Sequence, residues 1–494
     1  MKLNENRWIF GLLTIVIIFG SSIWFFTDDK IIQIDHPWEG VPTRPAHVDH
    51  KSLLKGPFKT GSQVTKACLE CHKEAGEQII HTAHWRWESD PIKMQGRDKL
   101  VTLGKKNSIN NFCIGIQGNW ESCTACHAGY GWEDETFDFT NQENVDCLVC
   151  HEQSGLYIKG KKGLPVEGVD LLAVAQSVGV PSRNNCGSCH FNGGGGNAVK
   201  HGDLDQSLFF PSEDLDVHMG RFNFVCVDCH KTEDHIIGGR STSVSLDNKN
   251  QIACTDCHNS RLHADARINS HTDTVACQTC HIPAVARKQA TKTYWDWSEA
   301  GDFFRAEDKH HYLKIKGSFI YEKGLVPDYR WFNGLADRYI LGDTLDPNEV
   351  TPINLPKGNI DDPKAKIWPF KIHLAKQPFD TKLNLLLQPK TVGKDGYWTD
   401  FDWDKALRLG SQYAGIGYSG EFGFTETEMY WPQTHMVAPK TAALQCKACH
   451  SPDGRMDWQS LGYPGDPVKW GNSERNLALS MEKHNEVESN NNEN

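Results

Sequence analysis

Eight copies of the pentapeptide Cys-x-x-Cys-His constrain this 494-residue sequence more than any other feature, and they use sixteen of its seventeen cysteines. Two thiols at this spacing can bond to the two vinyl groups of one haem, and the histidine that follows then lies beneath the iron as an axial ligand. Zinc knuckles would need paired half-sites, and a disulfide framework would not place histidine after every second cysteine. We therefore predict eight covalently attached haems c, each with its iron. They use Cys68, Cys71 and His72; Cys123, Cys126 and His127; Cys147, Cys150 and His151; Cys186, Cys189 and His190; Cys226, Cys229 and His230; Cys254, Cys257 and His258; Cys277, Cys280 and His281; and Cys446, Cys449 and His450.

The composition fits a chain that wraps cofactors. Only 38% of the residues are hydrophobic, which is low for a soluble core of this size, and the haems would supply the missing apolar surface. With 43 glycines and 22 prolines, turns are frequent. We predict a multihaem cytochrome c fold, built mainly of short α-helices and irregular coil around a haem array, with few strands. The net charge of −11 argues against nucleic acid as a partner and requires a locally positive funnel for any anionic substrate.

The N-terminus carries an apolar segment, residues 8–26, which follows Lys2 and Arg7 and precedes Asp28 and Asp29. Nineteen such residues just span a bilayer, with the basic flank on the cytoplasmic side. Because no small-residue cleavage site follows, we predict an uncleaved signal anchor at the bacterial inner membrane, with the body in the periplasm. The alternative is a cleaved signal and a soluble periplasmic protein.

The spacing of the motifs suggests a division of the chain. Seven motifs crowd together before a long stretch rich in Trp, Tyr, Pro and Asp, which predicts loops, short strands and some helix. The predicted segments are a cytoplasmic n-region (1–7), the anchor (8–26), a linker (27–66), a seven-haem core (67–290), a haem-wrapping region with the eighth haem (291–470) and a flexible tail (471–494).

Distal ligands decide whether a haem only passes electrons or can also bind a substrate. Of the 23 histidines, the eight motif residues leave fifteen. Six of these lie near motifs in polar, loop-like sequence, and His50 is the next candidate. Together they would suffice for seven six-coordinate haems, whereas His81 and His201 stay ambiguous because each neighbours a better candidate. The seven candidates are His50, His84, His218, His235, His263, His271 and His435.

Longer strings around the motifs carry a resemblance to a known family. They are Lys-Ala-Cys-Leu-Glu-Cys-His (66–72), Asn-Asn-Phe-Cys (110–113), Cys-Thr-Ala-Cys-His-Ala-Gly-Tyr-Gly-Trp (123–132), Phe-Asp-Phe-Thr-Asn (137–141), Val-Asp-Cys-Leu-Val-Cys-His (145–151), the glycine-rich loop 191–203 and Cys-Val-Asp-Cys-His-Lys-Thr-Glu-Asp-His (226–235). Over nearly everything beyond the anchor, the sequence resembles octahaem tetrathionate reductase, a distant relative of hydroxylamine oxidoreductase.

The resemblance implies that the second haem binds the substrate and that its distal ligand is Lys200. It also implies that Asn110 and Cys113 line the same pocket, and that Asn197 stands where close relatives have an acidic residue, so that proton delivery would differ. A lysine binds iron only as the neutral amine, which costs about 4.6 kcal/mol at pH 7 from a pKa of 10.4. The bond should therefore be weaker than that of histidine, and a substrate could displace it. Cys113, the remaining cysteine, could engage an S–S bond by exchange.

We therefore predict a reductase that splits tetrathionate into two thiosulfates, with nitrite and hydroxylamine as other possible substrates. Lys105, Lys106 and Arg183 are guesses for the basic set that attracts the anion. The expected electron donor is a quinol dehydrogenase or a smaller cytochrome c in the membrane or periplasm. The alternatives are a pure multihaem electron conduit, or oxidation of the kind that hydroxylamine oxidoreductase performs. No Cys-x-x-Cys-Lys motif is present, which counts against the nitrite reductases that use one.

Overall fold

A computed structural model describes residues 48–94, 96–110, 115–241 and 249–470. These residues belong to one compact unit that begins at residue 42. The predicted anchor, Cys113 and the predicted tail lie outside the described residues. Within the described ranges, no helix is both long and apolar enough to cross a membrane.

The helices are short, as the frequent glycine, proline and polar residues predict. They are α2 (Gly61–Cys71), α3 (Ala75–Ile80), α4 (Ala83–Arg86), α5 (Trp120–Cys123), α6 (Leu148–His151), α7 (Leu171–Gln176), α8 (Arg183–His190), α9 (Cys226–Cys229), α10 (Ala266–His271), α11 (Cys277–His281), α12 (Tyr397–Asp400), α13 (Trp403–Ala414) and α14 (Pro467–Trp470). Helix α2 already begins inside the predicted linker, so the chain before the first motif is partly helical.

Single 3-10 turns and one π-turn continue the irregular pattern. They are η1 (Thr124–Cys126), η2 (Gln142–Asn144), η3 (Lys161–Gly163), η4 (Gln206–Phe209), the π-turn η5 (Val217–Arg221), η6 (Cys254–Asp256), η7 (Trp297–Glu299), η8 (Lys440–Ala442) and η9 (Cys446–Ala448). Every motif lies on or beside one of these turns or short helices. In α6, α8 and α11 the motif histidine is the last helical residue.

Polar caps set where the motif helices begin. The side chain of Thr60 accepts a hydrogen bond from the backbone N–H of Gln63 at the start of α2. At the start of α8, Ser182 and Asn185 form a capping box, in which the Asn185 side chain accepts from the Ser182 backbone. These caps fix the phase of each helix and thereby the direction in which its cysteines and histidine point.

The strands are mostly short and most of them belong to one sheet. They are β1 (Ile92–Lys93), β2 (Leu100–Val101), β3 (Thr232–Glu233), β4 (Ile236–Ile237), β5 (Thr291–Asp296), β6 (Tyr312–Leu313), β7 (Gly317–Glu322), β8 (Asp328–Phe332), β9 (Ala336–Arg338), β10 (Thr351–Pro356), β11 (Lys366–Asp380), β12 (Leu385–Leu386) and β13 (Phe422–Pro432).

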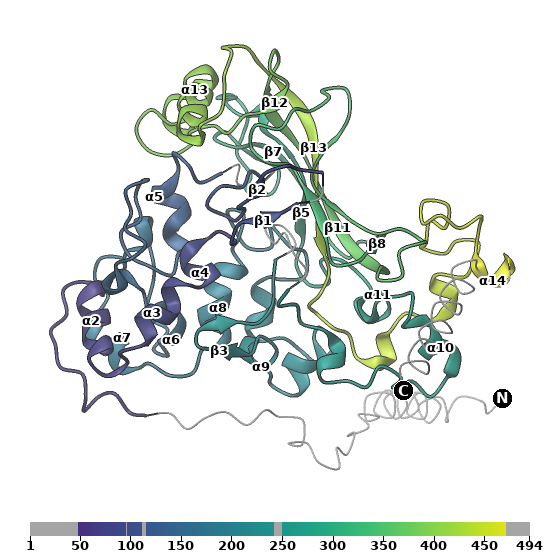
Figure 1. The fold of residues 1–494 in the computed structure, drawn as a ribbon, viewed down its shortest axis with the longest axis horizontal. Helices are drawn as coiled ribbons and strands as arrows, with labels where there is room; N and C mark the ends of the chain where they lie inside the picture. The colour runs from purple at the N-terminus through teal and green to yellow at the C-terminus, as the bar shows by residue number, and fades with distance from the viewer. Residues whose placement is uncertain (1–47, 95, 111–114, 242–248, 471–494) are drawn as a thin grey trace, which may run out of the picture. The chain divides into compact units, whose positions relative to one another are not determined.

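Nine strands pair in the order β6-β7-β5-β11-β13-β10-β9, with β8 and β12 also paired to β11. Strand β11 is the centre: it runs antiparallel to β13 from Phe370 to Asp380 and parallel to β5 at Leu374. Figure 1 shows β5, β11 and β13 side by side, with helices α2 to α9 to one side of them. All nine strands of this sheet lie within the predicted haem-wrapping region, residues 291–470, which agrees with the prediction of few strands in the rest of the chain.

The core beside the sheet is aromatic. Trp295, Trp297 and Trp431 are each about 1% exposed and pack with Phe319 and Met429. Two residues from the motif-rich half join this cluster: Ile109, which precedes Asn110, and Val199, which precedes Lys200. The sheet therefore supports the two loops that carry these predicted site residues.

Candidate haem centres

Seven motif histidines each face a second histidine ring. Each of the seven sequence-predicted distal candidates takes part in one such pair, although the sequence did not say which motif it would face. The pairs and the distances between ring centres are His50–His72 (6.4 Å), His84–His190 (6.0 Å), His151–His235 (6.4 Å), His218–His258 (6.0 Å), His230–His435 (6.3 Å), His263–His281 (6.2 Å) and His271–His450 (6.2 Å).

This spacing fits an iron between the two rings. An imidazole nitrogen about 2 Å from a metal puts the ring centre roughly 3 Å from that metal, so two rings on opposite sides lie about 6 Å apart. The residues present therefore fit a group held by two axial histidines.

The orientation of the rings agrees with that fit. In seven of these histidines Nδ1 donates to a nearby acceptor, which leaves Nε2 for a metal. The donors and acceptors are His50 to Val48 O (2.7 Å), His151 to Gly179 O (2.9 Å), His230 to Gly238 O (2.7 Å), His235 to Gln78 Oε1 (2.7 Å), His271 to Arg267 O (2.7 Å), His435 to Asp203 Oδ2 (3.3 Å) and His450 to Asp466 Oδ1 (2.7 Å).

The motif thiols show which haem sites are neighbours. No disulfide joins the sixteen motif cysteines, all of which the structure describes. Four pairs of thiols from different motifs lie close enough to shift each other's pKa: Cys68 with Cys147, Cys126 with Cys189, Cys186 with Cys226, and Cys254 with Cys277. In three further pairs the charge of one thiol helps to raise the pKa of the other: Cys150 with Cys186, Cys229 with Cys257, and Cys280 with Cys449.

The second motif differs from the others. The ring of His127 is fully buried, and the aromatic rings nearest to it are Trp132 (4.8 Å), Trp85 (5.1 Å), Trp87 (5.4 Å) and Phe137 (5.5 Å). Among the described residues no other histidine ring faces it. Its Nε2 donates to the carbonyl of Trp85 over 2.7 Å, whereas Nδ1 is buried without a hydrogen-bond partner. Burial lowers the pKa of His127 to about 3, so the ring is neutral, but its Nε2, the atom that the seven histidines above leave for a metal, is engaged with the Trp85 carbonyl.

Lys200 lies in the loop that follows α8 and the fourth motif. Its Nζ is 4.9 Å from the ring centre of Trp431, on β13. The positive charge of Lys200 helps to lower the pKa of Cys126 in the second motif and that of His190 in the fourth. Lys200 therefore lies within electrostatic range of the second motif, whose histidine faces no other described histidine ring.

The other predicted site residues have clear contacts where the structure describes them. The side chain of Asn197 donates to Gln289 and accepts from the backbone N–H of Gln206. The backbone carbonyl of Asn110 accepts from Gln377 on β11 over 3.1 Å. Cys113 lies outside the described residues, and its role stays a prediction.

The three basic residues guessed to attract an anion have different surroundings. Nζ of Lys105 lies 4.1 Å from the ring centre of Trp87, and the charge of Lys105 helps to lower the pKa of His127. Lys106 pairs with Glu88 over 3.2 Å. Arg183 donates to the backbone carbonyls of Phe209, Met219 and Phe224, so its guanidinium holds chain segments together. Of the three, Lys105 is the one whose position suits the guess.

The two ambiguous histidines face no motif histidine. His81 is exposed and pairs with Glu77 over 3.0 Å. The ring of the half-buried His201 lies 4.8 Å from that of Trp431, and desolvation lowers its pKa well below the usual value. His201 therefore belongs to the packing around Lys200.

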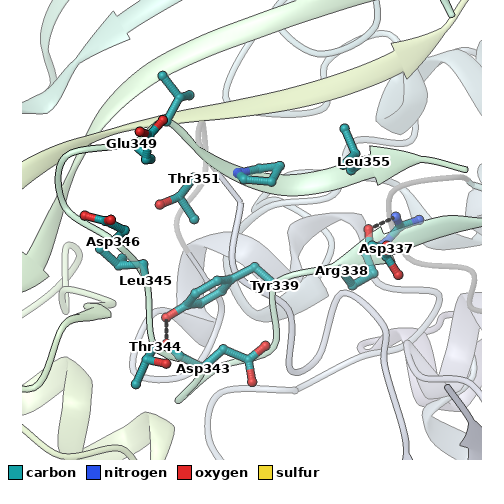
Figure 2. Close-up of a pocket in the computed structure, with 12 residues that line it drawn as sticks. Asp337, Arg338, Tyr339, Asp343, Thr344, Leu345, Asp346, Glu349, Thr351 and Leu355 are labelled. Carbon is teal, nitrogen blue, oxygen red and sulfur yellow. Dashed lines mark hydrogen bonds between the residues drawn. The ribbon is translucent and has the colours of Figure 1, made fainter. Parts of the chain in front are cut away.

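A cavity of about 380 Å³ is lined by β9, β10 and the loop that joins them, and no motif residue contributes to its lining. Figure 2 shows its acidic lining, with Asp337, Asp343, Asp346 and Glu349 around the ring of Tyr339. Tyr339 donates to the carbonyl of Asp343. Asp337 and Asp343 are paired with Lys357 and Arg97, and Asp346 and Glu349 add further negative charge, so this cavity does not suit the predicted anionic substrates.

Sequence reasoning missed three residues that the structure brings to these centres. Asp203 and Asp466 accept from histidines of two pairs, and Lys371 contacts the loop of Lys200. Lys371 had a signal: it stands in the apolar run Pro-Phe-Lys-Ile (369–372), where a lysine needs buried partners. The two aspartates have no such signal, since they lie in ordinary loop sequence.

Comparisons with known proteins agree with the motif pattern. Residues 292–453 match the family model described as cytochrome c bacterial, and residues 212–282 match that of cytochrome c7 and related cytochrome c. The crystal structure of octaheme cytochrome c from Shewanella oneidensis is 50% identical, with a TM-score of 0.81 over 85% of this chain and 98% of that chain.

Two curated proteins are more distant. An uncharacterised protein of Archaeoglobus fulgidus is 25% identical over 245 residues, which are 39% of this chain and 82% of that protein. The multiheme cytochrome MtrA of Shewanella baltica is 27% identical over 135 residues, which are 27% of this chain and 36% of MtrA. These similarities support covalently bound haem c as the group that the histidine pairs hold.

Proposed function

The chain belongs to the octahaem cytochromes c, and we propose that it binds eight haems and reduces a small anion at the second of them. The substrate we propose first is tetrathionate, with nitrite and hydroxylamine as further substrates. In the balanced reaction, tetrathionate takes up two electrons, its central S–S bond breaks, and two thiosulfates leave.

One observation carries this proposal: seven motif histidines face a second histidine, and His127 does not. A haem held by two histidines is saturated and serves electron transfer. A haem whose second ligand exchanges easily can bind a substrate. The second haem is therefore the proposed site of reduction, and the other seven are proposed to store and carry electrons.

Lys200 is the proposed distal ligand of the second haem. The charge of Lys200 acts on Cys126, and no described histidine ring faces His127. An amine binds metal only when it is neutral, so the net bond is weaker than that of histidine. A substrate that supplies its own donor atom can then replace Lys200, while Lys105 adds positive charge nearby. Asn110, Asn197 and Cys113 are proposed to orient the substrate.

The neighbouring thiols suggest how electrons reach this haem. When the thiol pairs described above are followed from one to the next, they connect motifs one, three, four, five, six, seven and eight in that order. The second motif joins this row at the fourth, through Cys126 and Cys189. We propose that electrons from either end of the row pass through the fourth haem to the second.

Turnover with reduced methyl viologen tests the proposal. The purified protein, with eight haems counted by pyridine haemochrome, is supplied separately with tetrathionate, nitrite and hydroxylamine. Lys200→Leu should change the rate at least tenfold for the preferred substrate, whereas Lys99→Leu, at an exposed lysine, should not. If the fully loaded protein turns over none of the three, the protein is an electron conduit instead.

The periplasm is the proposed location, with residues 8–26 as a membrane anchor and a quinol dehydrogenase or smaller cytochrome c as electron donor. The basis is the covalent haem, which bacteria attach outside the cytoplasm, together with the apolar N-terminal sequence. Fractionation of cells tests the anchor: the protein should stay in the membrane fraction after a high-salt wash. Release by osmotic shock alone would identify a cleaved signal.

A further inference from the structure

Lys371 is a buried lysine on β11 whose ammonium group contacts the loop of Lys200. It is 2% exposed. Its Nζ donates to the carbonyl of Val199 over 3.0 Å, to the carbonyl of Lys200 over 2.9 Å and to the hydroxyl oxygen of Thr291 over 2.6 Å. Three acceptors match the three N–H bonds of an ammonium group.

Two further side chains of the sheet hold the same loop. Thr291, on β5, donates to the carbonyl of Ala198 over 2.6 Å. Gln433, which directly follows β13, donates to the carbonyl of His201 over 3.2 Å. Four successive carbonyls, 198 to 201, thus accept from three side chains on or beside neighbouring strands.

The hydroxyl of Thr291 fixes the direction of these bonds. Because its hydrogen is directed to Ala198, its oxygen must accept from Lys371. All three contacts of Lys371 then require donated hydrogens, which only the protonated form supplies. Burial lowers the pKa of Lys371 well below its usual value, and the charge of Asp203 opposes this shift. We take Lys371 as an ammonium group, since the neutral amine would leave one acceptor unmet.

The glycine at 202 makes room for this arrangement. Its φ is +93°, a conformation that favours glycine. A Cβ at this position would lie 2.7 Å from Val285 and 3.1 Å from Cδ of Lys371. The loop therefore turns away directly after His201, and the stem of Lys371 passes close beside the turn.

We propose that Lys371, with Thr291 and Gln433, is a positioning residue that fixes the backbone of Lys200, so that exchange at the second haem involves only the Lys200 side chain. The inference rests on the proposed function, in which Lys200 is the distal ligand. Strands β5, β11 and β13 are hydrogen-bonded neighbours, so the three donors cannot move independently. With its backbone held, Lys200 can leave and return to one position without reorganising the loop.

Cyanide binding to the oxidised holoprotein tests the inference, because cyanide competes with the sixth ligand of a ferric haem. Wild type, Lys371→Met, Thr291→Val and Lys376→Met are compared by stopped-flow absorbance and by low-temperature EPR. Lys371→Met removes three donors at similar length, and Thr291→Val is milder if Lys371→Met fails to fold. Lys376, on the same strand, is the matched control because it lies five residues away and points to the other face.

Lys371→Met should bind cyanide about tenfold faster than wild type and split the EPR signal of the second haem into several low-spin species. Thr291→Val should change both readouts in the same direction but less, and Lys376→Met should leave them unchanged. If Lys371→Met and Thr291→Val both match wild type with all eight haems present, the positioning role is wrong.

Lys200→Leu separates this result from a failure of the proposed function. If Lys200→Leu alters the EPR signal while the Lys371 and Thr291 variants do not, Lys200 is a ligand and only the positioning role of Lys371 is wrong. If Lys200→Leu leaves both readouts unchanged, Lys200 is not the ligand and both proposals fall.

Discussion

The carboxylate of Asp466 accepts a hydrogen bond from Nδ1 of His450 over 2.7 Å. Backbone carbonyls accept the corresponding bond from His50, His151, His230 and His271. A carboxylate makes the imidazole a stronger electron donor than a neutral carbonyl does, and this stabilises the ferric state of a haem that the ring holds. The eighth haem should therefore have a lower reduction potential than haems held only by carbonyl-bonded histidines.

Asp466→Asn should raise that potential. The amide still accepts from Nδ1 but carries no charge, and the difference between a charged and a neutral hydrogen bond is about 1.4 kcal/mol, or roughly 60 mV for one electron. Spectroelectrochemical titration of the purified variant measures the shift as one haem out of eight. An unchanged titration curve would show that Asp466 does not tune the eighth haem.

The fourth haem should control the supply of electrons to the second. The ring of His84 lies 6.0 Å from that of His190, and burial lowers the pKa of His84, so it is neutral and ready to bind iron. His84→Met replaces an imidazole by a thioether, which raises the potential. A rise of about 120 mV would make onward transfer roughly a hundredfold less favourable.

The measurement is viologen-linked turnover with tetrathionate, with His271→Met as the matched control. His271 faces His450 at the end of the row of motifs, so this variant should lose far less activity. Equal losses in the two variants would contradict the fourth haem as the branch point.

Local sequence predicts the haem attachment sites and candidates for the distal histidines, because the motif is a chemical unit of five residues. Caps such as Thr60 and Ser182 set where two of the motif helices begin. The sequence could not predict which histidines face each other, because partners such as His230 and His435 lie far apart in the chain. Their role as ligands stays a prediction.

The central sheet could not be predicted for a related reason. Burial alternates along β11 from Lys371 to Gln377, but the buried positions include Lys371, His373 and Gln377 while Leu374 is exposed, so the polarity of the sequence does not show which face is buried. Its partners β5 and β13 begin 75 residues before and 56 residues after its first residue, Lys366. The contact between Lys371 and the loop of Lys200 depends on the pairing of β11 with β5 and β13, and no local sequence pattern predicts that contact.

A buried ion pair near the second motif should contribute strongly to stability. The carboxylate of Asp146 is fully buried and accepts from Nζ of Lys159 over 2.6 Å, from Tyr130 over 2.7 Å and from Tyr157 over 2.8 Å. Asp146→Asn leaves the buried Lys159 ammonium without its counter-charge, which typically costs about 3–5 kcal/mol.

Urea unfolding followed by far-UV circular dichroism measures this loss as a lower midpoint. Asp98→Asn, at an exposed aspartate, is the control and should unfold with wild type. A midpoint for Asp146→Asn within error of wild type would mean that the pair contributes no net stability. The haem content of each variant is checked first, because incomplete attachment would lower the midpoint for another reason.

Lys292 should make stability depend on pH. It is 3% exposed, and its Nζ lies 3.6 Å from the ring centre of Trp295 and 3.5 Å from that of Phe319. Burial, together with the charges of Lys316 and Lys371, lowers its pKa from 10.5 to about 6. Between these two values the unfolded chain binds the extra proton and the folded chain does not. Stability should therefore rise with pH across this window, by at most about 1.4 kcal/mol per pH unit.

Lys292→Met removes this linkage. The variant should be more stable than wild type at pH 7, by about 1–4 kcal/mol, and the gain should shrink as the pH approaches 10. The aromatic rings favour the ammonium form and would reduce the effect, by up to about 2 kcal/mol. Urea midpoints at pH 7, 8 and 9 give the slope, with Lys309→Met, at an exposed lysine, as the control. A variant with the same slope as wild type would show that Lys292 keeps its proton in the folded protein, held by the faces of Trp295 and Phe319.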